Sequence, residues 1–185
     1  MSDIDLEALA RDVAYLKDRQ AIADCICAHA RGHDRFDVDL LTAAYHPDGV
    51  DEHGAAINKG PDYAEWANAV HAGGSDLCLH NITTHTCEID GDTAHAESYV
   101  IVGLLNPGGA SARLINGRYV DRLEKRDGAW RIALRRCTVD LLIAGDASIL
   151  QAPQFRDGGY IRGARDETDV SYQRPLSLET SAPRW

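Results

Sequence analysis

An aspartate and a histidine are the residues whose types and positions best suit acid–base chemistry. Asp34 ends a helical segment, and His80 lies early in a stretch that alternates like a strand. An aspartate that accepts the Nδ1 hydrogen of a histidine fixes the tautomer of the ring and raises its basicity, so that Nε2 can take a proton from carbon or oxygen. His85 follows His80 by five residues, and an undistorted strand would place the two on opposite faces. We therefore expect only one of them in a cavity.

A carboxylate, a phenol and a second histidine are further catalytic candidates. Glu97 and Tyr99 share one face of the next strand, so that both face inward if one does. A carboxylate walled by apolar side chains has a raised pKa and can act as a general acid or base. The alternative is that Glu97 lies near the rim and pairs with an arginine. His29 precedes His33 by one helical turn and either faces the same cavity as a donor or lies on the helix surface.

Aromatic and basic residues are the candidates for substrate binding. Tyr45, Tyr63 and Trp66 lie on predicted helices, where they either line an apolar pocket suited to an aromatic substrate or belong to the ordinary core. Arg118 would hold a phenolate, carboxylate or methoxyphenol oxygen if it turned inward, and would otherwise form a salt bridge with Asp121 or Glu97. The other arginines of the last strands are interpreted as outer-face or rim charges: Arg113, Arg122, Arg135 and Arg136.

The eight histidines show no spacing typical of a metal site. No three of them form a pattern such as H-E-x-x-H, and the His29–His33 pair lacks the intervening glutamate. The sequence also contains no Gly-rich nucleotide loop and no G-x-S-x-G elbow. We therefore expect neither a metal nor an organic cofactor. The histidines in turns, at helix ends and near a hairpin are interpreted as solvent-exposed: His46, His53, His71 and His95.

Composition limits the class of protein. The 185 residues suffice for one domain with a modest tail. The net charge of -10 argues against nucleic-acid binding, and the apolar runs are too short to span a membrane. The acidic N-terminus lacks the features of a secretory signal, so we expect a cytoplasmic protein. An odd number of cysteines without CxxC spacing favours reduced thiols. All are interpreted as small core residues: Cys25, Cys27, Cys78, Cys87 and Cys137.

Helices are predicted for the first part of the chain. Apolar residues recur at helical spacing over residues 6–33, which form either two helices or one bent helix. Asp37 is the predicted N-cap of a short helix that Pro47-Asp48-Gly49 would end. A short strand pair over residues 50–57 leads to a third helix, which begins at Pro61 and ends at two glycines.

Four long strands are predicted for the second part, because β-branched and aromatic residues alternate and Gly, Asn and Asp mark the turns. They cover residues 77–89, 93–105, 113–125 and 130–142. Helices followed by an antiparallel meander indicate an α+β fold, a cone-shaped barrel in which N-terminal helices pack on a curved sheet and leave a hollow mouth. Residues 1–150 form this domain. Residues 151–185 lack periodicity and form an extended tail, either frayed or folded over the pocket or a neighbouring subunit.

Several short segments together resemble the SnoaL-like branch of the nuclear transport factor two-like superfamily, over about residues 5–145. They are Leu79-His80-Asn81-Ile82-Thr83, Asp90-Gly91-Asp92-Thr93-Ala94 before Ala96-Glu97-Ser98-Tyr99, and Gly117-Arg118-Tyr119 before Arg126-Asp127-Gly128-Ala129-Trp130-Arg131-Ile132. Within the branch, the sequence is most similar to lyases of the scytalone dehydratase, hexachlorocyclohexane dehydrochlorinase and bile-acid 7α-dehydratase types. In these, an aspartate at the end of the first helix pairs with a histidine on the first long strand, and Asp34 and His80 match those positions.

The sequence also departs from these lyases. The dehydratases carry a tyrosine about one helical turn before the aspartate, where this sequence has His29 nearby. The acid that the bile-acid enzyme carries along the second strand falls near Gly103. The group that assists the leaving group, and with it the substrate, therefore stays open.

The resemblance implies a cofactor-independent lyase in aromatic-compound catabolism, acting on an apolar, aromatic or alicyclic small molecule such as a lignin-derived diarylpropane. His80, oriented by Asp34, would remove a proton, while His29, Tyr99 or Glu97 would assist departure of water, halide or formaldehyde. The resemblance also implies a homo-oligomer, with a trimer favoured over a dimer. The alternatives are a non-catalytic β subunit of an aromatic-ring dioxygenase, or a binding protein or isomerase of the same fold.

Overall fold

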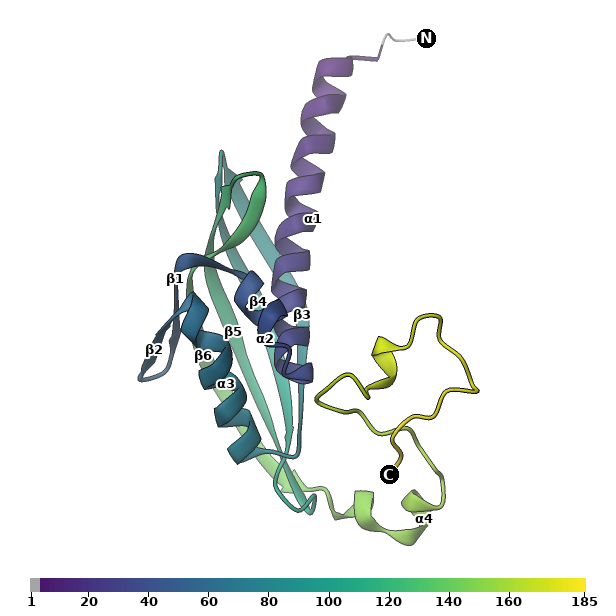
Figure 1. Cartoon of the computed structure of the whole chain (residues 1–185). Helices are drawn as coiled ribbons and strands as arrows, with labels where there is room; N and C mark the ends of the chain where they lie inside the picture. The colour runs from purple at the N-terminus through teal and green to yellow at the C-terminus, as the bar shows by residue number, and fades with distance from the viewer. Residues whose placement is uncertain (1–3) are drawn as a thin grey trace.

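In the computed structural model, which describes residues 4–185, three helices lie against one face of a long, twisted sheet (Figure 1). The first three residues of the acidic N-terminus lie outside the described part. The helices of the body are α1 (Leu6–Arg35), α2 (Val38–Ala43) and α3 (Gly60–Gly74). The strands are β1 (Tyr45–His53), β2 (Ala56–Lys59), β3 (Leu77–Asp90), β4 (Thr93–Leu105), β5 (Ser111–Arg126) and β6 (Ala129–Asp146).

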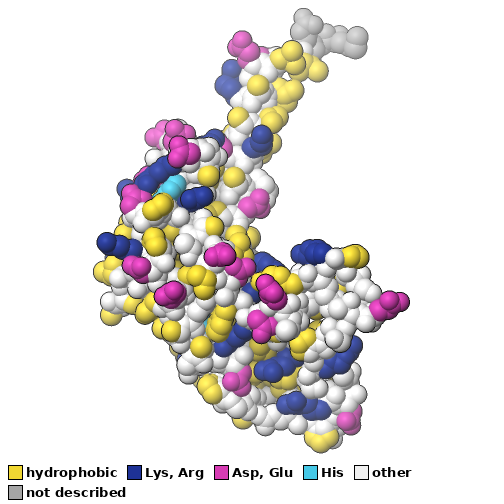
Figure 2. Space-filling view, viewed as in Figure 1, with side chains coloured by type: hydrophobic (Ala, Val, Ile, Leu, Met, Phe, Trp, Pro, Cys, Tyr) yellow, Lys and Arg dark blue, Asp and Glu magenta, His cyan; other side chains and the backbone are white. Residues whose placement is uncertain are grey.

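The first segment forms one continuous helix. Asp5 caps α1, since its carboxylate accepts the backbone N–H groups of Glu7 and Ala8 at 3.0 Å. Buried positions begin only at Ile22, and the N-terminal half of α1 extends beyond the sheet with hydrophobic side chains on its surface (Figures 1 and 2). Although α1 has 30 residues, neither it nor another helix within residues 4–185 is apolar enough to cross a membrane.

The second helix is shorter than the sequence predicts. Asp37 caps it as expected, accepting the backbone N–H of Leu40 at 2.9 Å, but α2 already ends at Ala43. The Pro47-Asp48-Gly49 segment, predicted to end the helix, lies inside β1. The reason is tertiary pairing: the backbone N–H of Ile132 on β6 donates to the carbonyl after the helix, and the chain continues in the sheet.

The sheet confirms the predicted α+β class and its four long strands. The order is β2-β1-β6-β5-β4-β3, antiparallel except for β1, which runs parallel to β6. The sheet is not a closed barrel: β2 and β3 are its edges and do not pair with each other within the described chain. Its inner face packs on the helices, and the cone opens where α1, α3 and the start of β3 meet.

A bulge in β3 overturns one prediction about the histidines. The register of β3 on β4 shifts between Ile82 and His85. The extra residue reverses the alternation, so that His80 and His85 both point to the inner face instead of opposite faces. His85 then forms a hydrogen bond of 2.9 Å with the buried Ser98 hydroxyl.

The cysteines are reduced, as predicted, but not all belong to the core. All five are free thiols in the described chain. Cys78 and Cys87 are buried, Cys25 and Cys137 are half-buried, and Cys27 is exposed on α1. The interpretation of Cys27 as a core residue is therefore wrong, because it lies on the side of α1 that borders an open cavity together with Asp34 and His80.

The C-terminal tail folds against the open end of the cone. Its short helices are η1 (Ser148–Gln151), α4 (Pro153–Arg156) and η2 (Val170–Tyr172). Arg35 at the end of α1 forms an ion pair of 3.2 Å with Asp169. Arg165 donates to the backbone oxygen and the hydroxyl of Ser75, each at 2.6 Å, and lies over the ring of Phe36. The tail thus lies beside the C-terminal ends of α1 and α3 (Figure 1).

Candidate active site

The structure brings Asp34 and His80 together. The last turn of α1 presents Asp34 to the start of β3, where its Oδ1 accepts the Nδ1 hydrogen of His80 at 2.8 Å. Both carboxylate oxygens also accept the backbone N–H of His80 at 3.0 Å. Three contacts to one residue fix the carboxylate, and the bond to Nδ1 leaves the lone pair on Nε2. The His80 side chain is 4% exposed, so this lone pair is largely shielded from water.

One cavity borders the pair directly, and a second lies next to it, behind His33 and His71. One has a volume of about 370 Å³ and is lined by Asp34 and His80, with Arg31 and Arg35 at its border. The other has a volume of about 250 Å³ and lies between α3 and the inner face of the sheet. Its wall is mostly apolar and aromatic: Tyr63, Trp66, Ala67, Val70, Leu104 and Ile115. These volumes suit a small apolar substrate.

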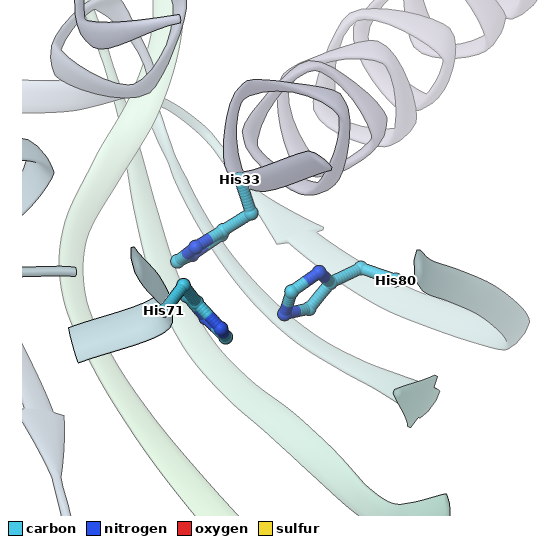
Figure 3. Close-up of side chains that lie close together, drawn as sticks. All are labelled: His33, His71 and His80. Atoms are coloured by element: carbon cyan, nitrogen blue, oxygen red, sulfur yellow. The ribbon is translucent and has the colours of Figure 1, made fainter. Parts of the chain in front are cut away.

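Two further histidines join the second cavity to His80 (Figure 3). His33 on α1 stacks on the His80 ring with 4.6 Å between centroids, and His71 on the last turn of α3 meets each of these rings edge-on at 5.3 Å. His33 Nε2 is 2.9 Å from the Tyr63 hydroxyl. A chain of rings thus connects the cavity wall to the candidate base.

Deeper in the cone lies a buried ionic network. Arg135 on β6 is fully buried, donates to both oxygens of Asp121 at 2.7 Å, and stacks 3.9 Å above the Tyr119 ring. Arg135 also lies 2.8 Å from His29 Nδ1. Because a guanidinium only donates, Nδ1 must accept, and the His29 proton resides on Nε2, which lies 3.1 Å from the Tyr45 hydroxyl.

This network continues to the side chains of β1. The Tyr45 hydroxyl donates to Asp51 Oδ2 at 2.7 Å. Asp51 Oδ1 lies 3.5 Å from His53 Nδ1. Burial disfavours a charge on His53, but contacts with Asp51 and Cys137 outweigh this effect and raise the pKa of His53 to about 10. His53 is therefore a cation at neutral pH, and it lines the second cavity.

The other inner histidines are held neutral. Burial lowers the pKa values of His29 and His33 well below the usual range, and the charge on Arg135 adds to the effect at His29. Burial also lowers the pKa of His71 to about 3. The second cavity therefore sets the neutral rings of His33 and His71 beside the cationic ring of His53, an arrangement that separates acid and base roles.

Glu97, Tyr99 and Arg118 do not join this site. All three lie on the outer face of the sheet, because the alternation that buries Ser98 and Val100 turns their neighbours outward. Arg118 binds Glu97 at 2.9 Å and Asp140 at 2.9 Å on that face. The expectation of an inward Glu97 and Tyr99 is therefore corrected, and the rim alternative for Glu97, paired with an arginine, describes its contact.

The remaining candidates divide between the cavity wall and the core. Tyr63 and Trp66 line the second cavity, whereas Tyr45 is fully buried behind it. His29 is also fully buried, which excludes the alternative of a helix-surface position.

Sequence analysis missed several residues of the cone. Arg135, interpreted as an outer charge, is buried, and Arg113 lines the second cavity. His53 and His71, expected in solvent, line it as well, and His46 is buried with Nε2 donating to the Glu124 carbonyl at 2.8 Å. His95 is exposed, as expected. The signal of Arg113, His46, His53 and His71 was weak because each lies near a strand or helix end, where periodicity does not decide orientation, whereas Arg135 lies inside β6 beyond a register shift.

Comparison with known proteins agrees with this architecture. The family model of the SnoaL-like domain matches residues 14–136, more than half of the chain. The chain belongs to the SnoaL-like domain family. This confirms the resemblance drawn from the sequence segments. No protein of curated function matches this SnoaL-like chain in sequence.

Solved structures share the SnoaL-like fold over most of their length. LinA is 25% identical, with a TM-score of 0.67 over 71% of this chain and 91% of that chain. LinA type 3 from Novosphingobium barchaimii, a hexachlorocyclohexane dehydrochlorinase, is 23% identical with a TM-score of 0.67 over 72% and 94%. A scytalone-dehydratase-like protein from Novosphingobium aromaticivorans is 17% identical with a TM-score of 0.63 over 70% and 88%.

Proposed function

We infer that the protein is a lyase that needs no cofactor and eliminates a small leaving group from an apolar, aromatic or alicyclic molecule. The observation that carries this inference is the bond of 2.8 Å between Asp34 and His80 Nδ1, beside two cavities of small-molecule size. The similarity to LinA, a dehydrochlorinase, supports the class of reaction.

In the proposed reaction, His80 Nε2 takes a proton from a substrate carbon. The C–H electron pair forms the new double bond, and the leaving group departs from the adjacent carbon with its own bonding pair. Asp34 stabilises the imidazolium that forms, because its carboxylate already accepts the Nδ1 hydrogen. A positioned general base of this kind contributes roughly 10²- to 10⁴-fold.

His53 supplies the complementary charge in this scheme. It is cationic at neutral pH and lies on the wall of the same cavity as His33 and His71. Halide departs as an anion and is stabilised by a positive charge alone, whereas hydroxide needs the proton itself. In a release of formaldehyde, His80 would instead take the proton of a hydroxymethyl group. The O–H electron pair then forms the C=O bond of formaldehyde, and the pair of the broken carbon–carbon bond forms the new double bond as the leaving group departs from the adjacent carbon.

The first test is turnover without added cofactor and with a chelator present, on a panel of halogenated alicyclic, hydroxylated aromatic and lignin-type diaryl substrates. Asp34→Asn and His80→Ala should lose turnover by about 10²-fold or more. Glu97→Gln, a carboxylate change on the outer face, should leave it unchanged.

The alternatives predict other results. A binding protein of this fold would turn over no member of the panel and would keep its ligand affinity in His80→Ala. A structural β subunit would show neither turnover nor specific binding. Full activity in Asp34→Asn would exclude the proposed pair even if the protein proved to be a lyase.

A further inference from the structure

Three histidines from separate parts of the chain converge at the open end of the cone. His33 comes from α1, His71 from α3 and His80 from β3, and one nitrogen of each lies within 4.8 Å of the others. Figure 3 shows the three rings turned toward a common space. Because the three histidines lie far apart in the sequence, no motif spacing predicts that they come together.

The hydrogen bonds of these rings leave nitrogen atoms without partners. Asp34 accepts from His80 Nδ1, so the lone pair of His80 is on Nε2. Tyr63 occupies His33 Nε2, while His33 Nδ1 is buried and has no hydrogen-bond partner among the described residues. His33 itself is only 1% exposed. A buried nitrogen without a partner is costly and requires an explanation, which a ligand at this point would supply.

The surroundings match those of known metal ligands. Histidines that bind metals commonly donate their other ring hydrogen to a carboxylate, as His80 does to Asp34. A tetrahedral ion with bonds of 2.0–2.1 Å holds its nitrogen ligands about 3.3 Å apart. Because the three nitrogen atoms already lie within 4.8 Å of one another, side-chain shifts of at most about 1.5 Å would bring them to this spacing. Three histidine ligands would leave the fourth position open.

A second set of candidate ligands is already satisfied internally. Asp34, Cys78 and His80 also lie within 4.8 Å of one another. However, the Cys78 thiol donates to the His33 carbonyl at 3.5 Å, and the Asp34 carboxylate is fully engaged by His80. The three histidines are therefore the better set.

We propose that His33, His71 and His80 bind a divalent transition-metal ion of the kind that prefers imidazole, represented by Zn²⁺, and that this ion silences the candidate base. One lone pair on His80 Nε2 cannot hold a metal and accept a proton at the same time. The silencing of His80 as a base rests on the proposed elimination reaction, whereas the binding of the metal ion does not depend on it.

The binding test uses the full chain without an affinity tag, stripped by chelator and dialysed. Calorimetric titration with Zn²⁺ should show one ion per chain, and Co²⁺ should give the intense visible bands of a tetrahedral site. His71→Ala should weaken Zn²⁺ binding by more than about 100-fold, and Asp34→Asn, which removes the outer partner, by about 10- to 100-fold. His95→Ala, a matched change at the exposed histidine of β4, should bind like the wild type.

Thermal melts separate misfolding from ligand loss. Zn²⁺ should raise the Tm of the wild type and of His95→Ala but not that of a folded His71→Ala or His71→Gln. Absence of Zn²⁺ binding by the wild type at millimolar concentration, or wild-type affinity in both His71 variants, would overturn the site.

The silencing has its own readout. With a substrate from the panel, Zn²⁺ should abolish turnover, chelator should restore it, and the inhibition constant should follow the calorimetric Kd across variants. Binding without inhibition would overturn the silencing while leaving the metal site in place. If the proposed elimination itself fails, calorimetry and the Co²⁺ spectrum still decide the metal site.

Discussion

Two of the three histidines of the second cavity, His53 and His71, differ from one another in charge, and this difference divides their tasks. His53 has its pKa raised to about 10, whereas that of His71 is lowered to about 3. Both face the same space between α3 and the sheet. Because His53 is positively charged and His71 is neutral, a substrate group that leaves as an anion should bind at the His53 end of the cavity.

His53 should therefore matter most for poor leaving groups. We expect His53→Gln to reduce the elimination of water more strongly than the elimination of halide, because hydroxide requires proton transfer and chloride does not. A loss of about 10²-fold or more for dehydration, with a smaller loss for dehydrohalogenation, is expected from paired kcat measurements. Equal losses for both leaving groups would contradict the role of His53 as an acid.

His71 links the stability of the fold to acid pH. Its pKa in the folded state lies below the usual 6.5, so between about pH 6.5 and 3 the unfolded chain binds a proton that the folded chain does not. The free energy of unfolding should thus fall as the pH drops through this window. Each such histidine adds at most about 1.4 kcal/mol per pH unit to the slope.

Denaturant titrations of the wild type and of His71→Gln at several pH values across this acid range measure how much His71 contributes to the pH dependence of the free energy of unfolding. The variant should show a shallower slope. The remaining dependence comes from the other groups with lowered pKa values, which include His29, His33, His85 and carboxyl groups such as Asp18. Equal slopes would show that the folded chain protonates His71 as readily as the unfolded chain does.

Individual site residues were predictable from the sequence where the chemistry of their side chains and the family resemblance indicated the same positions. Asp34 and His80 were identified in this way and lie in contact. Arg135 was missed, because an arginine in a strand is usually exposed and its partner Asp121 lies on another strand. Only the tertiary arrangement makes this charge an inner residue.

At the scale of elements, irregularities of the strands decide which residues face the cone. Strict alternation from Trp130 on β6 would turn Arg136 inward, but a register shift relative to β5 near Leu123 turns Arg135 inward instead. A second shift occurs at Gly117, where a Cβ atom would lie 2.0 Å from the Thr138 carbonyl oxygen. Helix and strand positions followed from periodicity, but bulges have no such signal.

The buried pair on these strands should be costly to break. Arg135→Met leaves Asp121 charged and unpartnered in the core, and we expect a loss of about 3–5 kcal/mol in the free energy of unfolding. Arg136→Met, which removes the exposed partner of Glu52 one residue further on, should cost about 0–1 kcal/mol. Urea denaturation of both variants measures the difference.

The double variant Arg135→Met/Asp121→Leu provides the control. Replacing both charges by apolar side chains of similar volume should recover most of the lost stability. If the double variant is as unstable as the single one, packing of the arginine stem over Tyr119 rather than the charge accounts for the loss.

At the scale of the whole molecule, large hydrophobic side chains are exposed together in two places. Leu6, Leu9, Val13 and Leu16 are exposed on the projecting half of α1 (Figure 2). The outer face of the sheet adds Leu79, Tyr99, Ile101, Leu114, Leu141 and Ile143. Large exposed patches of this kind mark interfaces, and we propose that copies of the chain associate through them.

Light scattering after size exclusion should give a mass that is a multiple of the 20.2 kDa chain. The double change Leu9→Glu/Leu16→Glu should shift the mass toward the monomer, because it places charges in the apolar strip. Arg11→Glu, on the opposite side of the same helix, should not. A wild-type protein of single-chain mass would contradict the proposal.

The parallel pairing of β1 with β6 also determines at which stage of chain synthesis the candidate site can form. Tyr45 pairs with Ile132, which lies 87 residues further along the chain, so a ribosome must synthesise this whole interval before the partner strand emerges. The cost of closing such a long loop is repaid only by late contacts, which slows folding. Asp34 and His80 are both synthesised early, yet Arg135 of the buried network deeper in the cone lies on β6. A nascent chain stalled before residue 129 would therefore carry every atom of the candidate base without the cone that shields it.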